Sequence, residues 1–152
     1  MASSFSDLGL ELMVTGENAG TWGDKTNTNL ELVQQAIAGY QSVTVSGTGT
    51  TTLNMTDGTI SNARNAVIKL AGTITGNIDV TIPNSIEKTY IVENATSGAH
   101  TVTFKTVSGS GFTFGATEKT RAILYSDGTN IVEVINNTQN LQDLSDLANT
   151  DG

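Results

Sequence analysis

The sequence predicts a mainly β protein: an antiparallel β-sandwich, jelly-roll-like, preceded by one short N-terminal α-helix. Charged residues make up only 14% of the 152 residues, whereas threonine, asparagine, glycine and serine, which suit strands and turns, are abundant. After residue 40, short alternating runs recur at a spacing of roughly eight to twelve residues, which favours an antiparallel sandwich or barrel over βαβ units. The clearest helical pattern in the chain precedes these runs.

The helix is expected over residues 28–38. Thr28 and Glu31 have the spacing of a capping box, in which each side chain bonds a backbone N–H of the first turn. Gly39 stands where a left-handed C-terminal cap is expected. A helix of about three turns is too short to be stable alone in water, so it must pack on another surface.

The apolar residues of this helix recur at helical spacing and form one stripe. The stripe consists of Leu30, Val33, Ala36, Ile37 and Tyr40. Because an amphipathic helix gains its stability from burying such a stripe, we expect it to lie on the β-domain or on a neighbouring chain.

The strands are expected in short segments bounded by turn residues. In residues 78–82, alternation turns the two isoleucines and Val80 inward, and Asp79 and Thr81 toward water. The last two segments flank Asp127-Gly128, and Asp-Gly between alternating runs strongly indicates a hairpin. The expected strands are 42–46, 50–56, 66–71, 78–82, 89–93, 101–105, 112–114, 120–125 and 130–135.

The same alternation predicts the core. In the final strand, Ile131 shares one side with Glu133, and Val132 shares the other with Val134. The core candidates are Val67, Leu70, Ile78, Val80, Ile82, Ile91, Val102, Phe104, Ile123, Val132 and Val134.

The chain divides into three parts. Residues 1–40 form an N-terminal attachment segment that contains the helix, and residues 41–135 form the β-sandwich domain. Residues 136–152 lose strand character and are expected to be a short frayed helix or a C-terminal linker. Three leucines recur there at every third position: Leu141, Leu144 and Leu147.

The composition argues against several classes of protein. Seven basic and fifteen acidic residues give a net charge of −8, and the basic residues are scattered, so nucleic acid is not expected as a partner. No apolar run approaches the roughly 18 residues that a membrane-spanning helix needs. The front end lacks the basic region of a signal peptide. Cysteine is absent, which excludes disulfides and thiolate metal sites.

Sites of catalysis, cofactor binding or metal binding are not expected either. His100 is the only histidine, so no histidine or cysteine cluster can hold zinc. The glycine-serine stretch 109–111 is not a nucleophile elbow, and the glycine-threonine stretches lack the lysine of a phosphate loop. Asp143 and Asp146 lack the companion ligands of a calcium loop. We therefore expect a protein that is not an enzyme.

Trp22 is the only tryptophan, and it is flanked by Gly20 and Gly23 in a polar segment expected to be a loop. Two interpretations stay open. Trp22 is either a core anchor of the N-terminal segment, or an exposed plug that enters a pocket of a partner, because tryptophan is enriched at binding hot spots.

The run GENAGTWGDKTNTNLELVQQAIAGY, residues 16–40, resembles a module of tail-fibre and other virion proteins of tailed phages, especially marine ones. The GTWG…TNTNL part carries most of the resemblance. The likeness continues through most of the chain, in NARNA at 62–66, IVENATSG at 91–98, TVTFK at 101–105, LYSDGTNIVE at 124–133 and LQDLSDLA at 141–148.

The resemblance implies a structural protein of the virion, the virion-proximal anchoring part of a tail fibre, that carries out no reaction. It implies other phage tail or capsid proteins as partners, a homotrimer, and no nucleic acid or membrane. A capsid decoration protein or a glycan-binding module of the particle is the alternative. In such fibres the leucine segment leads on to a shaft and tip, which implies that residues 136–152 are a linker or the start of a fibre stalk. Host contact is expected only if a longer fibre continues past Gly152. The residues expected to dock on the partner are Trp22, Leu30, Val33, Ile37 and Tyr40.

Overall fold

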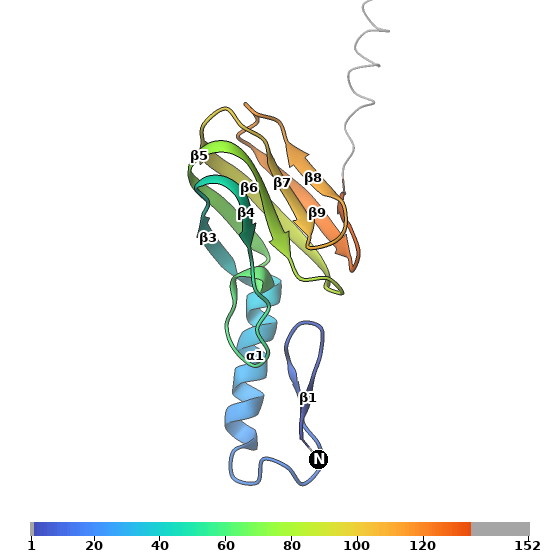
Figure 1. The fold of residues 1–152 in the computed structure, drawn as a ribbon. Helices are drawn as coiled ribbons and strands as arrows, with labels where there is room; N and C mark the ends of the chain where they lie inside the picture. The colour runs from blue at the N-terminus through green and yellow to red at the C-terminus, as the bar shows by residue number, and fades with distance from the viewer. Residues whose placement is uncertain (1, 135–152) are drawn as a thin grey trace, which may run out of the picture.

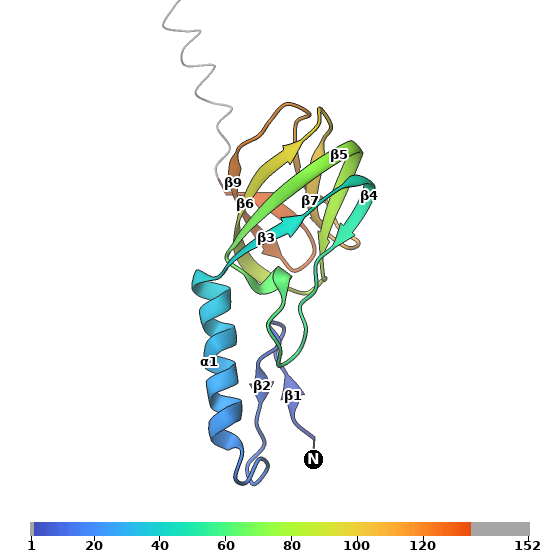
Figure 2. The same ribbon diagram turned by 90° about the vertical axis from the view of Figure 1, so that its left-hand side faces the viewer.

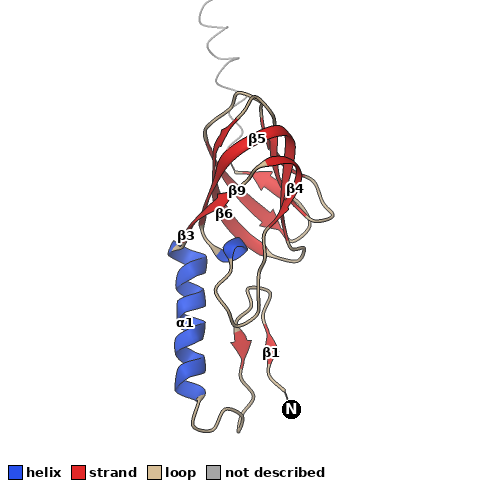
Figure 3. Cartoon of the chain, turned by 60° about the vertical axis from the view of Figure 1, so that its left-hand side comes forward, coloured by secondary structure: helices blue, strands red, loops and turns tan. Residues whose placement is uncertain are grey.

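The computed structural model describes residues 2–134. The expected leucine stripe at 141–147 and the part of the chain from 135 onward lie outside the described residues. Figure 1 shows a β-barrel-like body from one end of which an N-terminal arm projects, and residues 2–38 form this arm. The long helix of the arm lies outside the body, beside a small hairpin (Figure 3).

The arm contains the strands β1 (Ser4–Phe5) and β2 (Glu11–Leu12), which pair antiparallel, and the helix α1 (Trp22–Ala38). The body contains the remaining elements. They are β3 (Tyr40–Thr44), β4 (Gly47–Thr52), the 3-10 helix η1 (Asn62–Arg64), β5 (Val67–Ile82), β6 (Glu87–Ser97), β7 (Val102–Thr106), β8 (Gly111–Phe114), β9 (Arg121–Asp127) and β10 (Ile131–Glu133).

The main sheet is mixed and nearly closed, and the prediction of an antiparallel sandwich is wrong in this respect. The strand order is β10-β9-β6-β5-β7-β8, and β3 and β4 also pair with β5. All four partners of β5 run parallel to it, whereas β6–β9, β9–β10 and β7–β8 are antiparallel (Figure 2). The sheet nearly closes where the Ile131 N–H donates to the Ser110 carbonyl at 3.0 Å. The fold is therefore mainly β with one N-terminal helix, around a barrel-like sheet.

Strand β5 organises the body because it is 16 residues long and pairs along both edges. The sequence suggested two strands separated at 72–76, but the strand continues through this glycine-containing stretch. Gly72 has a φ of +126°, and a Cβ there would lie 2.4 Å from the Val45 carbonyl oxygen. Glycine at position 72 therefore lets β5 change direction while the strand stays in contact with the backbone of Val45.

The core predictions are correct for one part of the sheet and wrong for another. Leu70, Ile78, Val80, Ile82, Val102 and Phe104 are all buried, as expected. Val67 is only half-buried, and four further candidates are exposed: Ile91, Ile123, Val132 and Val134. In β6, β9 and β10 the opposite face is buried, through Tyr90, Val92, Ala122, Leu124 and Ile131. These strands carry apolar residues on both faces, so alternation could not decide which face points inward.

Two further face assignments change. Thr81 was expected to face water but is buried, and its hydroxyl donates to the Thr52 hydroxyl at 3.4 Å. Ile131 is buried instead of sharing a solvent-facing side with Glu133.

Replacing Ile82 by alanine is expected to lower the free energy of unfolding by roughly 2–5 kcal/mol, because the side chain is fully buried and leaves a cavity. Chemical denaturation of the purified chain measures the change. The matched control is Ile60→Ala, because Ile60 is 66% exposed and its loss should cost less than about 0.5 kcal/mol. Equal costs for the two variants would contradict the assignment of Ile82 to the core.

Helix α1 is longer than expected and begins at Trp22 instead of Thr28. Thr28 lies inside the helix, so the expected capping box does not form, and the N-cap residue Thr21 makes no side-chain cap hydrogen bond. Gly39 is extended, with a φ of −69°, and is not a left-handed cap. Glycine is required there for another reason, since a Cβ would lie 2.4 Å from the Gln35 carbonyl oxygen.

Candidate docking surface

One face of α1 is fixed to the rest of the chain. Leu32 is its buried apolar residue. The Asn29 side chain donates to the Glu11 carbonyl and accepts from the Glu11 N–H, both at 2.9 Å, as a neighbouring strand would. The Lys25 ammonium lies 2.9 Å from the Glu11 carboxylate and lowers the pKa of that carboxyl through their hydrogen bond. These contacts hold the hairpin against the helix (Figure 2).

Arg64 joins the arm to the body. Its fully buried guanidinium donates to three backbone carbonyls: Leu8 at 2.7 Å, Thr56 at 2.6 Å and Thr59 at 2.7 Å. It also donates to the Gln35 side chain at 3.1 Å. One side chain thus connects the hairpin, the helix and the loop before η1. Sequence analysis attached no role to Arg64 beyond its place in the NARNA stretch.

A second side of α1, together with the first residue of β3, carries an apolar stripe that no described residue covers. We define the apolar stripe as Trp22, Leu30, Val33, Ile37 and Tyr40. Trp22, Leu30 and Ile37 are 65%, 62% and 74% exposed, and Val33 and Tyr40 are also exposed. The interpretation of Trp22 as a core anchor is therefore wrong. Trp22 is the first residue of α1, at the end of the helix furthest from the body (Figure 1).

A second exposed apolar feature crosses the outer face of the sheet. We call it the apolar ladder: Tyr40, Val67, Ile91, Ile123 and Val134, with Tyr125 and Val132 in the adjacent row. The first four residues are direct partners across β3, β5, β6 and β9. The Val134 N–H donates to the Ile123 carbonyl at 2.9 Å and places Val134 next in line. Sequence analysis assigned most of these residues to the core, so the ladder was missed.

The stripe and the ladder meet at the junction of the arm and the body. A hollow of about 320 Å³ is lined there by Ala36, Ile37, Ala66, Lys88, Thr89 and Ile91. Ile37 belongs to the stripe and Ile91 to the ladder, so the two features form one continuous apolar surface. The Lys88 ammonium lies at this junction and donates to the carbonyls of Ala36 at 3.1 Å and Thr89 at 2.9 Å.

Burial lowers the pKa of Lys88 to about 8. Since the unfolded chain still binds this proton up to about pH 10, stability should rise with pH between about 8 and 10. Allowing for solvent screening of this partly exposed group, the rise is about 1–2 kcal/mol. It is measured as the difference between wild type and Lys88→Met in denaturation at pH 7.5 and pH 10, which cancels other titrating groups. A difference that stays constant with pH would contradict the lowered pKa.

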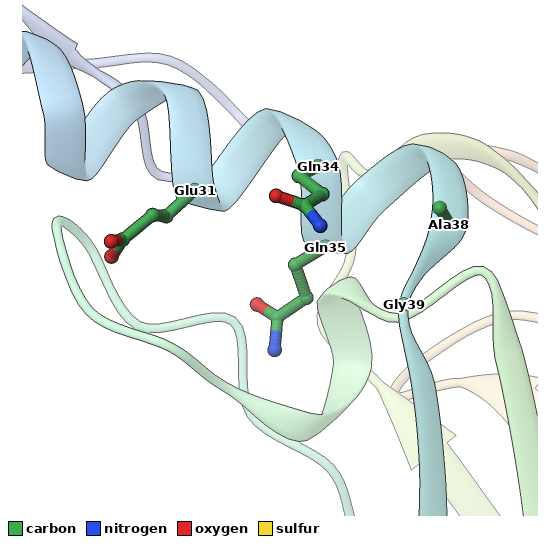
Figure 4. A pocket seen from close by; sticks show the side chains of 5 residues that line it. All are labelled: Glu31, Gln34, Gln35, Ala38 and Gly39. Carbon is green, nitrogen blue, oxygen red and sulfur yellow. The ribbon is translucent and has the colours of Figure 1, made fainter.

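A second hollow, of about 200 Å³, lies on another side of α1. It is lined by Glu31, Gln34, Gln35, Ala38 and Gly39. The side chains of Glu31, Gln34 and Gln35 line it from two neighbouring turns of the helix (Figure 4). Gln35 already accepts hydrogen bonds from Arg64 and from the Ser61 N–H. This hollow therefore belongs to the junction that Arg64 holds together.

The described part of the chain offers no other kind of site. Residues 2–134 contain no group of three or more acidic, histidine or cysteine side chains placed to hold a metal ion. In the same residues no helix combines the length and the apolar character needed to cross a membrane. Comparisons of the chain with family models, with curated proteins and with solved structures gave no match.

Proposed function

We propose that this chain is a structural protein of a tailed-phage particle: the virion-proximal anchoring part of a tail fibre, located in the tail. The observation that carries the proposal is the exposed apolar stripe along an arm that projects from the body and begins, at its far end, with Trp22. All five residues expected to dock are exposed. The resemblance of residues 16–40 to virion proteins supports the same function.

In this proposal the far end of the arm, with Trp22 as its apolar anchor, enters a pocket or groove of another tail or capsid protein, and the body carries the fibre outward. The hairpin contacts of Asn29 and the carbonyl contacts of Arg64 brace the arm, so its apolar side chains are presented in a fixed direction. Preorganisation of this kind reduces the entropy lost on binding. Three copies assemble, and no reaction, cofactor, nucleic acid or membrane takes part. Host contact belongs to a longer fibre.

The alternative, a capsid decoration protein or a glycan-binding module, has less support. Glycan platforms place two or more exposed aromatic rings side by side with polar groups. Here Trp22 begins α1, Tyr40 begins β3, and Tyr125 lies on β9 with two strands between it and β3. These rings occupy separate parts of the molecule.

Immunogold labelling and electron cryomicroscopy of phage particles test the proposal. Antibodies raised against the purified chain should label the tail at the base of the fibres. Particles treated with antibodies from the same animals before immunisation are the control. Label on the capsid shell would favour the decoration protein. If no part of the particle is labelled, the virion role is refuted.

A further inference from the structure

We infer that copies of this chain pack on each other through one continuous surface, made of the apolar ladder and the body-proximal part of the apolar stripe. That part comprises Leu30, Val33, Ile37 and Tyr40. The inference rests on the proposed function, because its setting is an assembled fibre base. It identifies a second copy of the chain as the partner that covers the apolar ladder, which docking of the arm on the virion would leave exposed. Trp22, at the far end of the arm, stays outside this contact and is left for the virion partner.

The surface is long enough for a stable contact between folded proteins. The helical part spans about 10 Å from Leu30 to Ile37 at 1.5 Å per residue, and the ladder, which includes Tyr40, crosses five strands about 4.8 Å apart. With a width of roughly 15 Å, the strip covers roughly 500 Å² of projected area, which approaches the ~800 Å² per partner of a standard interface. It also reaches the size of the largest apolar patches on ordinary monomers, ~300–600 Å², which are often functional.

The spacing on the helix suits a contact between identical helices. Leu30, Val33 and Ile37 follow one another on α1 at intervals of three and four residues, and Tyr40 follows at the start of β3. This is the a/d pattern by which helices pack side by side in coiled coils. The adjacent side of α1 is already occupied by the hairpin, through Asn29 and Lys25. Rotational symmetry would therefore place the free stripe of each copy against that of its neighbour.

The charge distribution explains why copies of an acidic chain can meet here. The net charge of −8 makes most approaches between copies repulsive. The stripe and both rows of the ladder contain no charged residue. The Lys88 ammonium lies at their junction, where it donates to the carbonyls of Ala36 and Thr89. In the row beside the ladder, the Glu93 carboxylate lies 3.7 Å from the Lys69 ammonium and 3.2 Å from Arg121 Nε. The negative charge of Glu93 is thus paired with two positive charges. Depletion of charge at the centre is typical of protein interfaces.

Light scattering and sedimentation equilibrium of the full chain test the inference. Wild type should be oligomeric at micromolar concentration. Ile123→Glu in the ladder and Ile37→Glu in the stripe should each raise the dissociation constant at least 30-fold, because each buries a charge in the contact. The matched control is Ile60→Glu: Ile60 is 66% exposed but belongs to neither feature, so its variant should keep the wild-type mass.

Circular dichroism must show the same fold for the three variants, and a conservative Ile123→Val variant covers the case in which glutamate prevents folding. Ile123→Val should remain oligomeric with a weaker association. A monomeric wild-type chain would overturn the inference. So would an oligomer that resists both glutamate variants and dissociates on Leu144→Glu, because the C-terminal segment would then hold the copies together. Loss of particle labelling with an intact oligomer would instead refute only the virion role.

Discussion

Replacing Arg64 by alanine is expected to lower the free energy of unfolding by about 3–5 kcal/mol, the largest loss from any single truncation at the junction of the arm and the body. The guanidinium is fully buried and donates four hydrogen bonds, three of them to backbone carbonyls. Alanine leaves those carbonyls without their donor inside the protein, where water does not replace it. Each such group costs about 1–3 kcal/mol.

The geometry explains why arginine stands here. Its planar fork reaches backbone carbonyls of the hairpin and of the loop before η1, and the Gln35 side chain of α1, whereas lysine offers donors from a single point. A Cβ on Gly9 would lie 2.6 Å from Arg64 Nη2, and Gly9 has a φ of +74°. The hairpin therefore has room for the guanidinium only because residue 9 is glycine. Arg64→Lys should therefore recover only part of the stability that alanine loses.

Chemical denaturation of wild type, Arg64→Ala and Arg64→Lys measures these losses. The matched control is Arg121→Ala, because the Arg121 side chain is 72% exposed and pairs only with Glu93 at the surface. Exposed ion pairs of this kind contribute about 0–1 kcal/mol. If Arg64→Ala costs no more than Arg121→Ala, the junction does not depend on Arg64.

Sequence alternation located the centre of the barrel correctly. In residues 78–82 the inward residues are large and apolar and Asp79 is polar, so one face was clearly the core face. Only Thr81 was misassigned. It lies on the same side of β5 as Asp79 but is buried, with its hydroxyl 3.4 Å from that of Thr52. Threonine suits either face of a strand, so the residue type did not decide its environment.

The same reasoning failed where both faces of a strand are apolar. Strand β9 carries Leu124 on its buried face and Ile123 on its exposed face, and β10 carries Ile131 and Val132 in the same way. A shift of one residue exchanges the two faces, and the pattern contains nothing to prevent it. An interaction surface needs apolar residues on the outer face of the sheet. The same outward-facing residues that form the ladder therefore led to the wrong core assignments.

Parallel pairing was also beyond the sequence pattern, because parallel and antiparallel strands share the same period of two. Tyr40, Val67 and Ile91 are aligned in the sheet, at separations of 67 − 40 = 27 and 91 − 67 = 24 residues. Crossovers of this length usually contain a long helix, whereas here loops with a three-residue 3-10 helix make the connection from β4 to β5. The expectation of short antiparallel strands followed from that general rule.

The stripe on α1 was recognised because its spacing is strongly helical, but the start of the helix was not. Gly23, Asn27 and Asn29 are weak helix formers, which favoured the capping box at Thr28. Asn29 instead gains two hydrogen bonds to the Glu11 backbone, a tertiary contact that outweighs its low propensity. The extra turns carry Trp22 out to the tip of the arm.

Replacing Trp22 by alanine is expected to abolish incorporation of the chain into particles and to leave its melting temperature nearly unchanged. The side chain is 65% exposed, and its backbone carbonyl, which accepts from the Thr26 hydroxyl at 2.8 Å, is unaffected by the substitution. Surface truncations of this kind change stability by about 0.5 kcal/mol or less. At a binding hot spot, loss of a tryptophan costs 2 kcal/mol or more, which corresponds to at least a ~30-fold weaker association.

Calorimetry gives the melting temperature, and complementation of a phage lacking the wild-type chain, followed by quantification of the chain in purified particles, gives incorporation. Val107→Ala is the control, because Val107 is 56% exposed on the body and belongs to neither the stripe nor the ladder. Trp22→Phe should restore part of the incorporation, since a smaller ring still fills part of an apolar pocket. A Trp22→Ala chain that is stable and incorporated as well as Val107→Ala would refute the anchor. A melting temperature lowered by many degrees would mean that Trp22 supports the fold of the arm, because a buried tryptophan contributes roughly 3–5 kcal/mol.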